Sequence, residues 1–145
     1  MEFKHTLPIQ LRFNDVDAFG HVNNSVYFTF YDLGKTTYLN DVMKKYHLEN
    51  SFSGIVVVNI NANFLLPVYA GDHVAVQTAV VEIGQKSFKL MQQLVSIGTK
   101  EVKCTCSSVM VAFDVKTQTT LQIPQEWKNA FTEYEGHDIP HKHKE

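Results

Sequence analysis

Long apolar runs are absent from this chain of 145 residues. The longest are residues 55–58 and 109–113, whereas a membrane-spanning helix needs about 20 mostly apolar residues. Residues 1–11 contain one lysine and no apolar run, so no secretory signal is predicted. Cysteine is also scarce: Cys104 and Cys106 are two residues apart, which excludes a disulfide framework and predicts reduced thiols on one face of a strand. These absences predict a cytoplasmic protein that does not enter a membrane.

The chain also lacks a large excess of charge of one sign, since its formal net charge is −2. Without a general positive field there is no support for binding to nucleic acid or to an anionic membrane. The Gly-x-Ser-x-Gly motif of serine hydrolases and the glycine loops of nucleotide-binding folds are missing too. Apolar residues make up 44% of the chain and charged residues 19%, which is typical of a globular protein. The length fits one domain, predicted over residues 1–135, followed by a polar tail over 136–145.

Side chains capable of binding metal gather in that tail, at His137, Asp138, His141 and His143. A zinc site needs ligands held in tetrahedral geometry, and a polar chain end offers no evident scaffold. We therefore predict a solvated, mobile tail and no metal site.

Apolar residues alternate with polar ones from Leu7 to Phe13, which predicts a half-buried strand. A polar turn with Gly20 leads to residues 24–46, where apolar side chains recur at helical spacing. The residues of this stripe are Tyr27, Phe30, Tyr31, Tyr38 and Val42, and further apolar residues on other faces are Val26, Phe28 and Leu33. The pattern predicts a long helix that is buried on most sides.

Period-two patterns return over residues 56–66, 73–83, 87–97 and 101–115, and short turns with glycine join the later runs. Such turns favour antiparallel neighbours. In the first run, Val56, Val58, Ile60, Ala62, Phe64 and Leu66 are predicted on one face, and Asn59, Asn61 and Asn63 on the other. Residues 124–134 are a candidate short helix. The predicted fold class is α+β, with one long helix against a five-stranded antiparallel sheet. Since one sheet cannot cover every apolar face of the helix, we expect at least a dimer.

The segment between the first strand and the long helix carries the strongest signal for chemistry. Asp17 precedes a helix N-terminus, where unpaired backbone N–H groups favour negative charge. An ionised aspartate can attack a thioester or activate water, and N–H groups from about Asn24 onward could polarise the thioester carbonyl. In isolation, Asp and Asn before a helix are more often caps and turns. Asn23 and Asn24 are both candidates for the N-cap.

The full string closely resembles the 4-hydroxybenzoyl-CoA thioesterase-like family of hotdog enzymes. The matching residues are Arg12-Phe13, Asp15-Val16-Asp17, Gly20-His21-Val22-Asn23-Asn24 and Tyr27, with weaker matches at residues 61–64, Pro67, Gly71-Asp72 and 84–88. The resemblance covers about residues 6 to 115, and the form from Asp17 to Asn24 is similar to acyl-CoA and acyl-ACP thioesterases of bacteria and plants.

This resemblance implies a hotdog fold, in which a five-stranded antiparallel sheet wraps around one long central helix. It implies homodimers joined sheet edge to sheet edge, often paired into a homotetramer, with active sites at the dimer interface. It also implies that Asp17 is the nucleophile or general base. Asn24 aligns where one branch of the family carries a catalytic histidine, so a histidine-assisted mechanism is not expected here. Tyr27 aligns with an active-site tyrosine of that branch.

Four further residues are candidates for substrate binding, each with a structural alternative. His21 could contact substrate or stabilise the loop, and Asn23 could contact substrate or cap the helix. Lys86 and Ser87 follow a glycine turn and could meet the phosphates of CoA, or could form an ordinary exposed turn. The asparagines at 59, 61 and 63 could line an acyl pocket or an inter-dimer surface, or could be a solvated strand face.

The expected function is hydrolysis of an acyl-CoA thioester to a free acid and CoA, with no cofactor besides the CoA of the substrate. An acyl-ACP thioesterase is the first alternative. A hydratase or dehydratase is another, although these typically need a catalytic histidine paired with an acid. A non-catalytic acyl-CoA binding module would keep the fold and be indifferent to the loss of the Asp17 carboxylate. Phe28, Phe30 and Tyr31 suit a fatty or aromatic acyl group, or a plain helix core.

Overall fold

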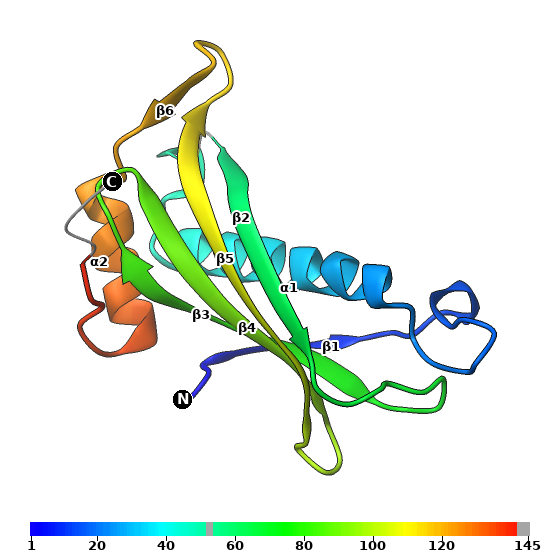
Figure 1. Ribbon diagram of the computed structural model, residues 1–145. Coiled ribbons are helices and arrows are strands. Elements are labelled where there is room, and N and C mark those ends of the chain that lie inside the picture. The colour runs from blue at the N-terminus through cyan, green and yellow to red at the C-terminus, as the bar shows by residue number, and fades with distance from the viewer. Residues whose placement is uncertain (52–53, 142–145) are drawn as a thin grey trace.

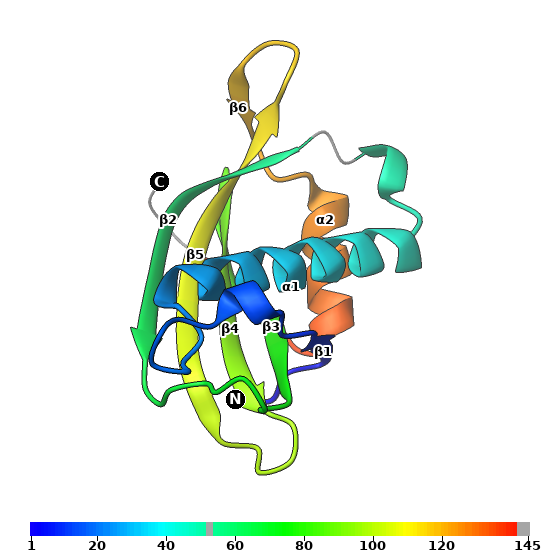
Figure 2. The same cartoon turned by 90° about the vertical axis from the view of Figure 1, so that its right-hand side faces the viewer.

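A computed structural model describes residues 1–51 and 54–141 of the chain (Figure 1). The strands are β1 (His5–Ile9), β2 (Ile55–Phe64), β3 (Val74–Ile83), β4 (Ser87–Ser96), β5 (Val102–Asp114) and β6 (Thr119–Leu121). The helices are α1 (Asn24–Lys45) and α2 (Gln125–Glu135), with short 3-10 turns η1 (Phe13–Asp15) and η2 (Glu49–Ser51). The strand order is β1-β3-β4-β5-β2, every neighbouring pair is antiparallel, and β6 pairs with β5. The sheet curves along one side of α1 (Figure 2), which confirms the predicted hotdog fold apart from the short sixth strand.

Helix α1 begins where the sequence predicts, because Asn23 caps it. The Asn23 side chain accepts a hydrogen bond from the Ser25 N–H at 3.0 Å, which satisfies one of the free donors of the first turn. At the other end, Lys44 and Lys45 lie in the last turn, where positive charge is favourable. The predicted stripe of Tyr27, Phe30, Tyr31, Tyr38 and Val42 is buried throughout.

Two core clusters divide the length of α1. The first packs the C-terminal half of the helix, with Tyr38, against the ends of β3 to β5 and against Trp127 and Phe131 of α2. The second packs the N-terminal half, with Tyr27 and Tyr31, against the opposite ends of β3 to β5. Figure 1 shows α2 at one end of α1 and the loop that precedes α1 at the other.

Helix and sheet approach closely at Gly34, which lies in α1 against Val76 of β3. A Cβ atom on residue 34 would lie 2.5 Å from Val76 Cγ1. We expect Gly34→Ala to destabilise the protein by about 1 kcal/mol or more, because overpacking outweighs the gain in helix propensity. Urea unfolding measures this loss. Gly98→Ala is the control, since a Cβ there meets nothing within 4 Å, and equal stability of the two variants would contradict the close approach.

The first strand is shorter than predicted. β1 ends at Ile9, and the chain turns into η1, so Phe13 leaves the sheet and is 94% exposed. The alternating pattern persists beyond the strand because Leu11 packs against the second core cluster and Phe13 borders a pocket beside the sheet. The predicted strand to Phe13 is therefore wrong at its C-terminal end.

The predicted face of β2 is also wrong in part. The register slips between Val57 and Asn59, so Val57 opposes Met110 and Asn59 opposes the adjacent Val109. The extra residue reverses the alternation. As a result Val56 shares the outer face with the asparagines, while Ile60 and Phe64 face α1.

The C-terminal tail packs on the domain as far as residue 141. Ile139 is buried, and the Ile83 N–H donates to the Pro140 carbonyl at 3.0 Å. The prediction of a mobile tail is wrong for residues 136–141, because Ile139 anchors them, and His143 lies outside the described residues. Across residues 1–51 and 54–141, no group of three or more His, Cys, Asp or Glu side chains is arranged to hold a metal ion.

Both cysteines are free and buried in β5 beneath the helix, as predicted for reduced thiols on one face of a strand. Burial raises the pKa of Cys104, and burial with the nearby Cys104 raises the pKa of Cys106 to about 12. Within the described part of the chain, no helix is both long and apolar enough to cross a membrane.

Candidate active site

Asp17 lies in a tight turn between η1 and α1. Its N–H donates to the His21 carbonyl at 2.8 Å, and the Gly20 N–H donates to the Asp17 carbonyl at 3.1 Å. Gly20 adopts φ of 83°, a left-handed conformation that a glycine takes without steric cost. Val16 and Val22 pair on either side of the turn, which holds Asp17 directly before the helix.

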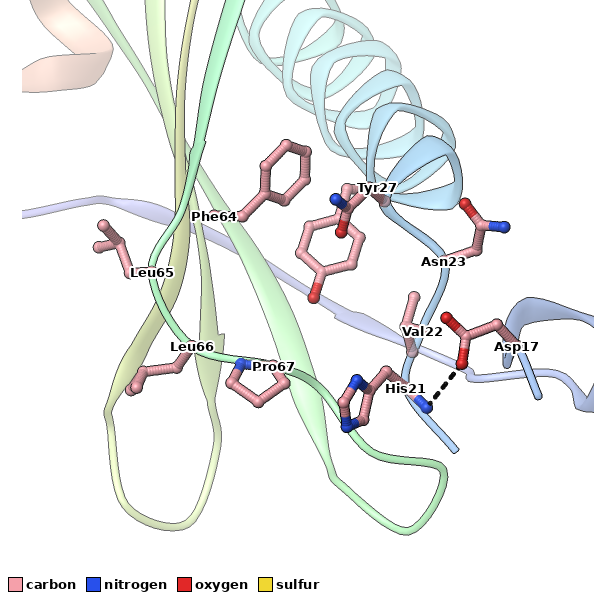
Figure 3. Close-up of a pocket in the computed structure, with 10 residues that line it drawn as sticks. Asp17, His21, Val22, Asn23, Tyr27, Phe64, Leu65, Leu66 and Pro67 are labelled. Carbon is pink, nitrogen blue, oxygen red and sulfur yellow. Dashed lines mark hydrogen bonds between the residues drawn. The ribbon is translucent and has the colours of Figure 1, made fainter. Parts of the chain in front are cut away.

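The turn orients the Asp17 carboxylate through one of its two oxygens. Oδ1 accepts hydrogen bonds from the Phe19 N–H at 2.9 Å and from the His21 N–H at 3.3 Å. Figure 3 shows the second of these bonds. Among the described residues no donor lies against Oδ2. The aspartate therefore acts as the turn residue that its sequence context favours, and its second oxygen keeps no hydrogen bond to the described residues.

The N-terminus of α1 lies beside this carboxylate. Asn23 uses its side chain as the cap, and the Val26 N–H donates to the Asn23 carbonyl at 2.9 Å. In the part of the chain that the structure describes, the Asn24 N–H has no acceptor. A free N–H at the positive end of a helix of 22 residues is a suitable donor to a developing oxyanion.

Asp17 and the helix N-terminus border a pocket of about 420 Å³. Its lining residues are Asp17, His21, Val22, Asn23, Asn24, Tyr27 and residues 64–67. Figure 3 shows the polar side chains on the side of the helix and its preceding loop, and Phe64, Leu65 and Leu66 on the opposite side. The pocket thus has hydrogen-bonding groups on one wall and an apolar wall at the end of β2.

Tyr27 and His21 line the same pocket and are held by ring contacts. The Tyr27 ring is buried and meets the Phe64 ring edge-on, with centroids 5.1 Å apart. Burial is the main cause that raises the pKa of Tyr27, so its hydroxyl stays protonated at neutral pH. The His21 ring packs edge-on against Tyr69 at 4.9 Å, and the two backbones pair there, so His21 also stabilises the loop.

A second pocket, of about 270 Å³, also borders Asp17. Leu11, Arg12, Phe13, Val16 and Ala70 line it together with Asp17. Arg12 is the only arginine in the sequence, and sequence reasoning did not single it out as a candidate for binding. Asp17 therefore stands at the boundary between two pockets.

Lys86 and Ser87 are not among the residues that line either pocket. They precede Phe88, which belongs to the core cluster at the α2 end, whereas Tyr27 belongs to the cluster at the other end. A strand of ten residues such as β4 spans about 30 Å, so within one chain this turn is remote from Asp17. The row of Asn59, Asn61 and Asn63 lies on the outer face of β2, away from the first pocket.

Comparison with known proteins agrees with the fold. Residues 11–131 match the Thioesterase-like superfamily. The long-chain acyl-CoA thioesterase FadM of Escherichia coli (strain K12) is 26% identical over 118 residues, which cover 81% of this chain and 89% of FadM.

Solved structures share the architecture. A thioesterase from Thermus thermophilus, in complex with coenzyme A and zinc, has a TM-score of 0.82 at 23% identity, covering 94% of this chain and 98% of that one. Slr0204, a 1,4-dihydroxy-2-naphthoyl-CoA thioesterase from Synechocystis, has a TM-score of 0.71 at 16% identity, covering 88% and 94%. Since the family match spans most of the sequence, the chain belongs to the thioesterase-like superfamily and is a thioester hydrolase of the hotdog fold.

Proposed function

We propose that the protein hydrolyses acyl-CoA thioesters to a free acid and CoA, with Asp17 as the catalytic carboxylate. The observation that carries this proposal is the position of Asp17. Its unbonded Oδ2 stands at the start of α1, between two pockets that can receive the two arms of a thioester. The resemblance to FadM supports CoA as the carrier.

The proposed reaction places the thioester carbonyl oxygen at the Asn24 N–H. Asp17 then follows one of two routes. As a nucleophile, it attacks the carbonyl carbon, the carbon–sulfur bond breaks to release the CoA thiolate, and water hydrolyses the mixed anhydride. As a general base, it takes a proton from water as the water attacks. Both routes consume one water and yield the acid and CoA. Oxyanion donors of this type are each worth roughly 10²–10³ in rate in other acyl-transfer enzymes.

We assign supporting roles around that carbonyl to four further residues: Tyr27, Asn24, His21 and Asn23. The Asn24 N–H is the oxyanion donor, and the buried, protonated Tyr27 hydroxyl is a second donor available to substrate. His21 and Asn23 hold the loop and the helix start, and both line the pocket. We assign the acyl arm to the pocket with the apolar wall and the CoA arm to the pocket with Arg12.

The proposed enzyme is a dimer joined along β2. This edge strand has ten residues, no proline, and exposed apolar side chains at Val56, Val58 and Ile60. The other edge, β1, is short and carries Pro8, which suits an unpaired edge. On α1, Phe28 is 37% exposed and Leu33 is 50% exposed. A second subunit could therefore also bury part of the helix surface.

We expect Val58→Lys to weaken the dimer by at least about tenfold, because it puts a charge on the edge that would pair. Sedimentation velocity across a concentration series measures this. Val115→Lys, which also replaces an exposed valine but lies beyond the end of β5, should behave as wild type. A monomeric wild type, or equal effects of the two changes, would contradict the interface.

The homotetramer and the cytoplasmic location stay predictions from the sequence.

Lys86 and Ser87 also stay predictions. In one chain they lie at the end of the sheet remote from Asp17, so any contact with CoA bound at this pocket would come from another subunit.

The proposed function is tested by thiol release from acyl-CoAs of several chain lengths and from matched acyl-ACPs. Faster turnover of the CoA esters supports the proposal, and turnover of the ACP esters alone would transfer it to the carrier protein. Folded protein that binds acyl-CoA without releasing thiol would be a binding module.

A further inference from the structure

The inner side of the edge strand β2 is less covered over residues 60–64 than the inner sides of β3 to β5. One inner row runs across four strands through Val76, Leu94, Cys104 and Phe64. The first three are 0% exposed, whereas Phe64 is 41% exposed. Ile60 faces the same side of β2 and is also 41% exposed. The helix therefore leaves a partly uncovered apolar strip, formed by Ile60, Ala62 and Phe64, along the inner side of the edge strand.

Phe64 stands where this strip meets the active-site pocket. It is the last residue of β2 and lines the pocket with Asp17. Its ring packs edge-on against Tyr27 at 5.1 Å and against Phe28 at 6.4 Å, so it bridges from the strand to the helix. Figure 3 shows Phe64 beside Tyr27, on the side of the pocket away from His21.

Beyond Phe64 the strip continues along β2 without a charged side chain. Ala62 is half-buried and Ile60 follows it on the strand, while Phe28 borders the strip from α1. An unbranched acyl chain whose carbonyl carbon lies at Asp17 would leave the polar wall and meet this apolar path. The Phe64 ring stands across it.

We propose that Phe64 is a specificity-determining residue that sets how long an acyl chain the pocket accepts. This inference rests on the proposed function, and it specifies the substrate as an unbranched acyl group whose far end reaches Phe64. With the ring in place, methylenes beyond it gain no burial. With the ring removed, the chain extends toward Ala62 and Ile60, and each newly buried methylene raises affinity roughly fourfold.

The test uses S-(2-oxoalkyl)-CoA analogues, which keep the carbonyl but cannot be hydrolysed at the carbon–sulfur bond. Titration calorimetry gives their Kd as a function of chain length for wild type, Phe64→Ala and Phe64→Trp. We expect the chain length at which affinity stops rising to become longer in Phe64→Ala and shorter in Phe64→Trp. The ratio of long-chain to short-chain affinity should rise at least about tenfold in Phe64→Ala. Val115→Ala, which removes exposed apolar area far from the pocket, should match wild type.

Several results would overturn the inference. One is an unchanged dependence of affinity on acyl-chain length in both Phe64 variants. Another is an equal loss of affinity at every chain length in variants that circular dichroism shows to be folded. In the second case Phe64 would only support Tyr27. A change in dimer dissociation with no change in length dependence would mean that a second subunit fills the strip.

The same titrations separate this inference from the proposed function. Acyl-CoA turnover by wild type is measured in parallel. If wild type binds the analogues with the expected Phe64 dependence but hydrolyses no acyl-CoA, the specificity role stands and the catalytic proposal fails. If wild type hydrolyses acyl-CoAs but the Phe64 variants show the same dependence of affinity on chain length as wild type, the catalytic proposal stands and the specificity role of Phe64 fails. If folded wild type binds no analogue, both fail.

Discussion

Replacement of Asp17 by asparagine is expected to lower kcat for acyl-CoA hydrolysis by at least about 100-fold, the scale of a general acid–base contribution. The variant keeps an oxygen that can accept the Phe19 and His21 N–H hydrogen bonds at 2.9 and 3.3 Å, so the turn should survive. It loses the negative charge and basicity of the second oxygen, which both proposed routes need. Thiol release under saturating substrate measures kcat, and a thermal melt confirms that the variant is folded.

Asp15→Asn is the matched control for this variant. Asp15 also accepts a backbone hydrogen bond, from the Arg12 N–H at 2.8 Å, but it does not line either pocket that borders Asp17. We expect less than about a tenfold effect on kcat. If Asp17→Asn kept wild-type turnover, another group would be the base. If both variants lost activity equally, distortion of the loop would explain the loss.

The nucleophilic and general-base routes differ in where the oxygen of water goes. A single turnover in water enriched in heavy oxygen labels the Asp17 carboxylate only if water opens an anhydride at the Asp17 side, and labels the released acid otherwise. Mass spectrometry of the peptide that contains Asp17 detects this label. A labelled Asp17 would establish the covalent route.

The second large effect is expected from Tyr38→Phe, which should lower the free energy of unfolding by roughly 1.5–3 kcal/mol, the range for hydrogen bonds to charged groups. Glu135, at the end of α2, is only 2% exposed. Its Oε2 accepts hydrogen bonds from the Tyr38 hydroxyl at 2.5 Å and from the Val80 N–H at 3.3 Å. Without the hydroxyl, the buried carboxylate keeps only the longer of these two contacts. Urea unfolding at neutral pH measures the loss.

Tyr31→Phe is the control because it removes a hydroxyl of the same kind from the same helix. Tyr31 is 1% exposed, and within the described chain its hydroxyl has no ordinary hydrogen-bond partner, only the Cys104 thiol beside it. Thiols are weak partners, so loss of this hydroxyl should be neutral or slightly stabilising. An equal loss in both variants would show that the contact with Glu135 is not what makes Tyr38 important.

Local patterns in the chain were sufficient to predict the main elements. The repeat of Tyr27, Phe30, Tyr31, Tyr38 and Val42 identifies the helix and its buried stripe, because helical spacing is a property of neighbouring residues. Asn23 marks the start of the helix for the same reason, since a cap bonds to an N–H two residues away. The candidate carboxylate followed from the segment between Asp17 and Asn24, which forms one continuous turn and helix start.

Tertiary structure decided how those elements meet. The extra residue between Val57 and Asn59 reversed the faces of β2, and a bulge depends on the opposing strand. Phe13 lies beside a pocket instead of in a strand. Lys86 lies at the opposite end of the sheet from Asp17, because antiparallel pairing places successive turns at alternate ends of the sheet.

Tertiary structure also decided the candidate roles of Phe64 and Arg12 at the site. Nothing near Phe64 in the sequence distinguishes it from other apolar strand residues, and its role depends on Tyr27 and Phe28 approaching from the helix. Arg12 gains a candidate role only because its pocket shares Asp17 with another. Periodicity and capping act between residues a few positions apart, so the sequence alone reveals them. Contacts between distant segments depend on the packing of the whole chain, so only the folded structure reveals which residues share the site.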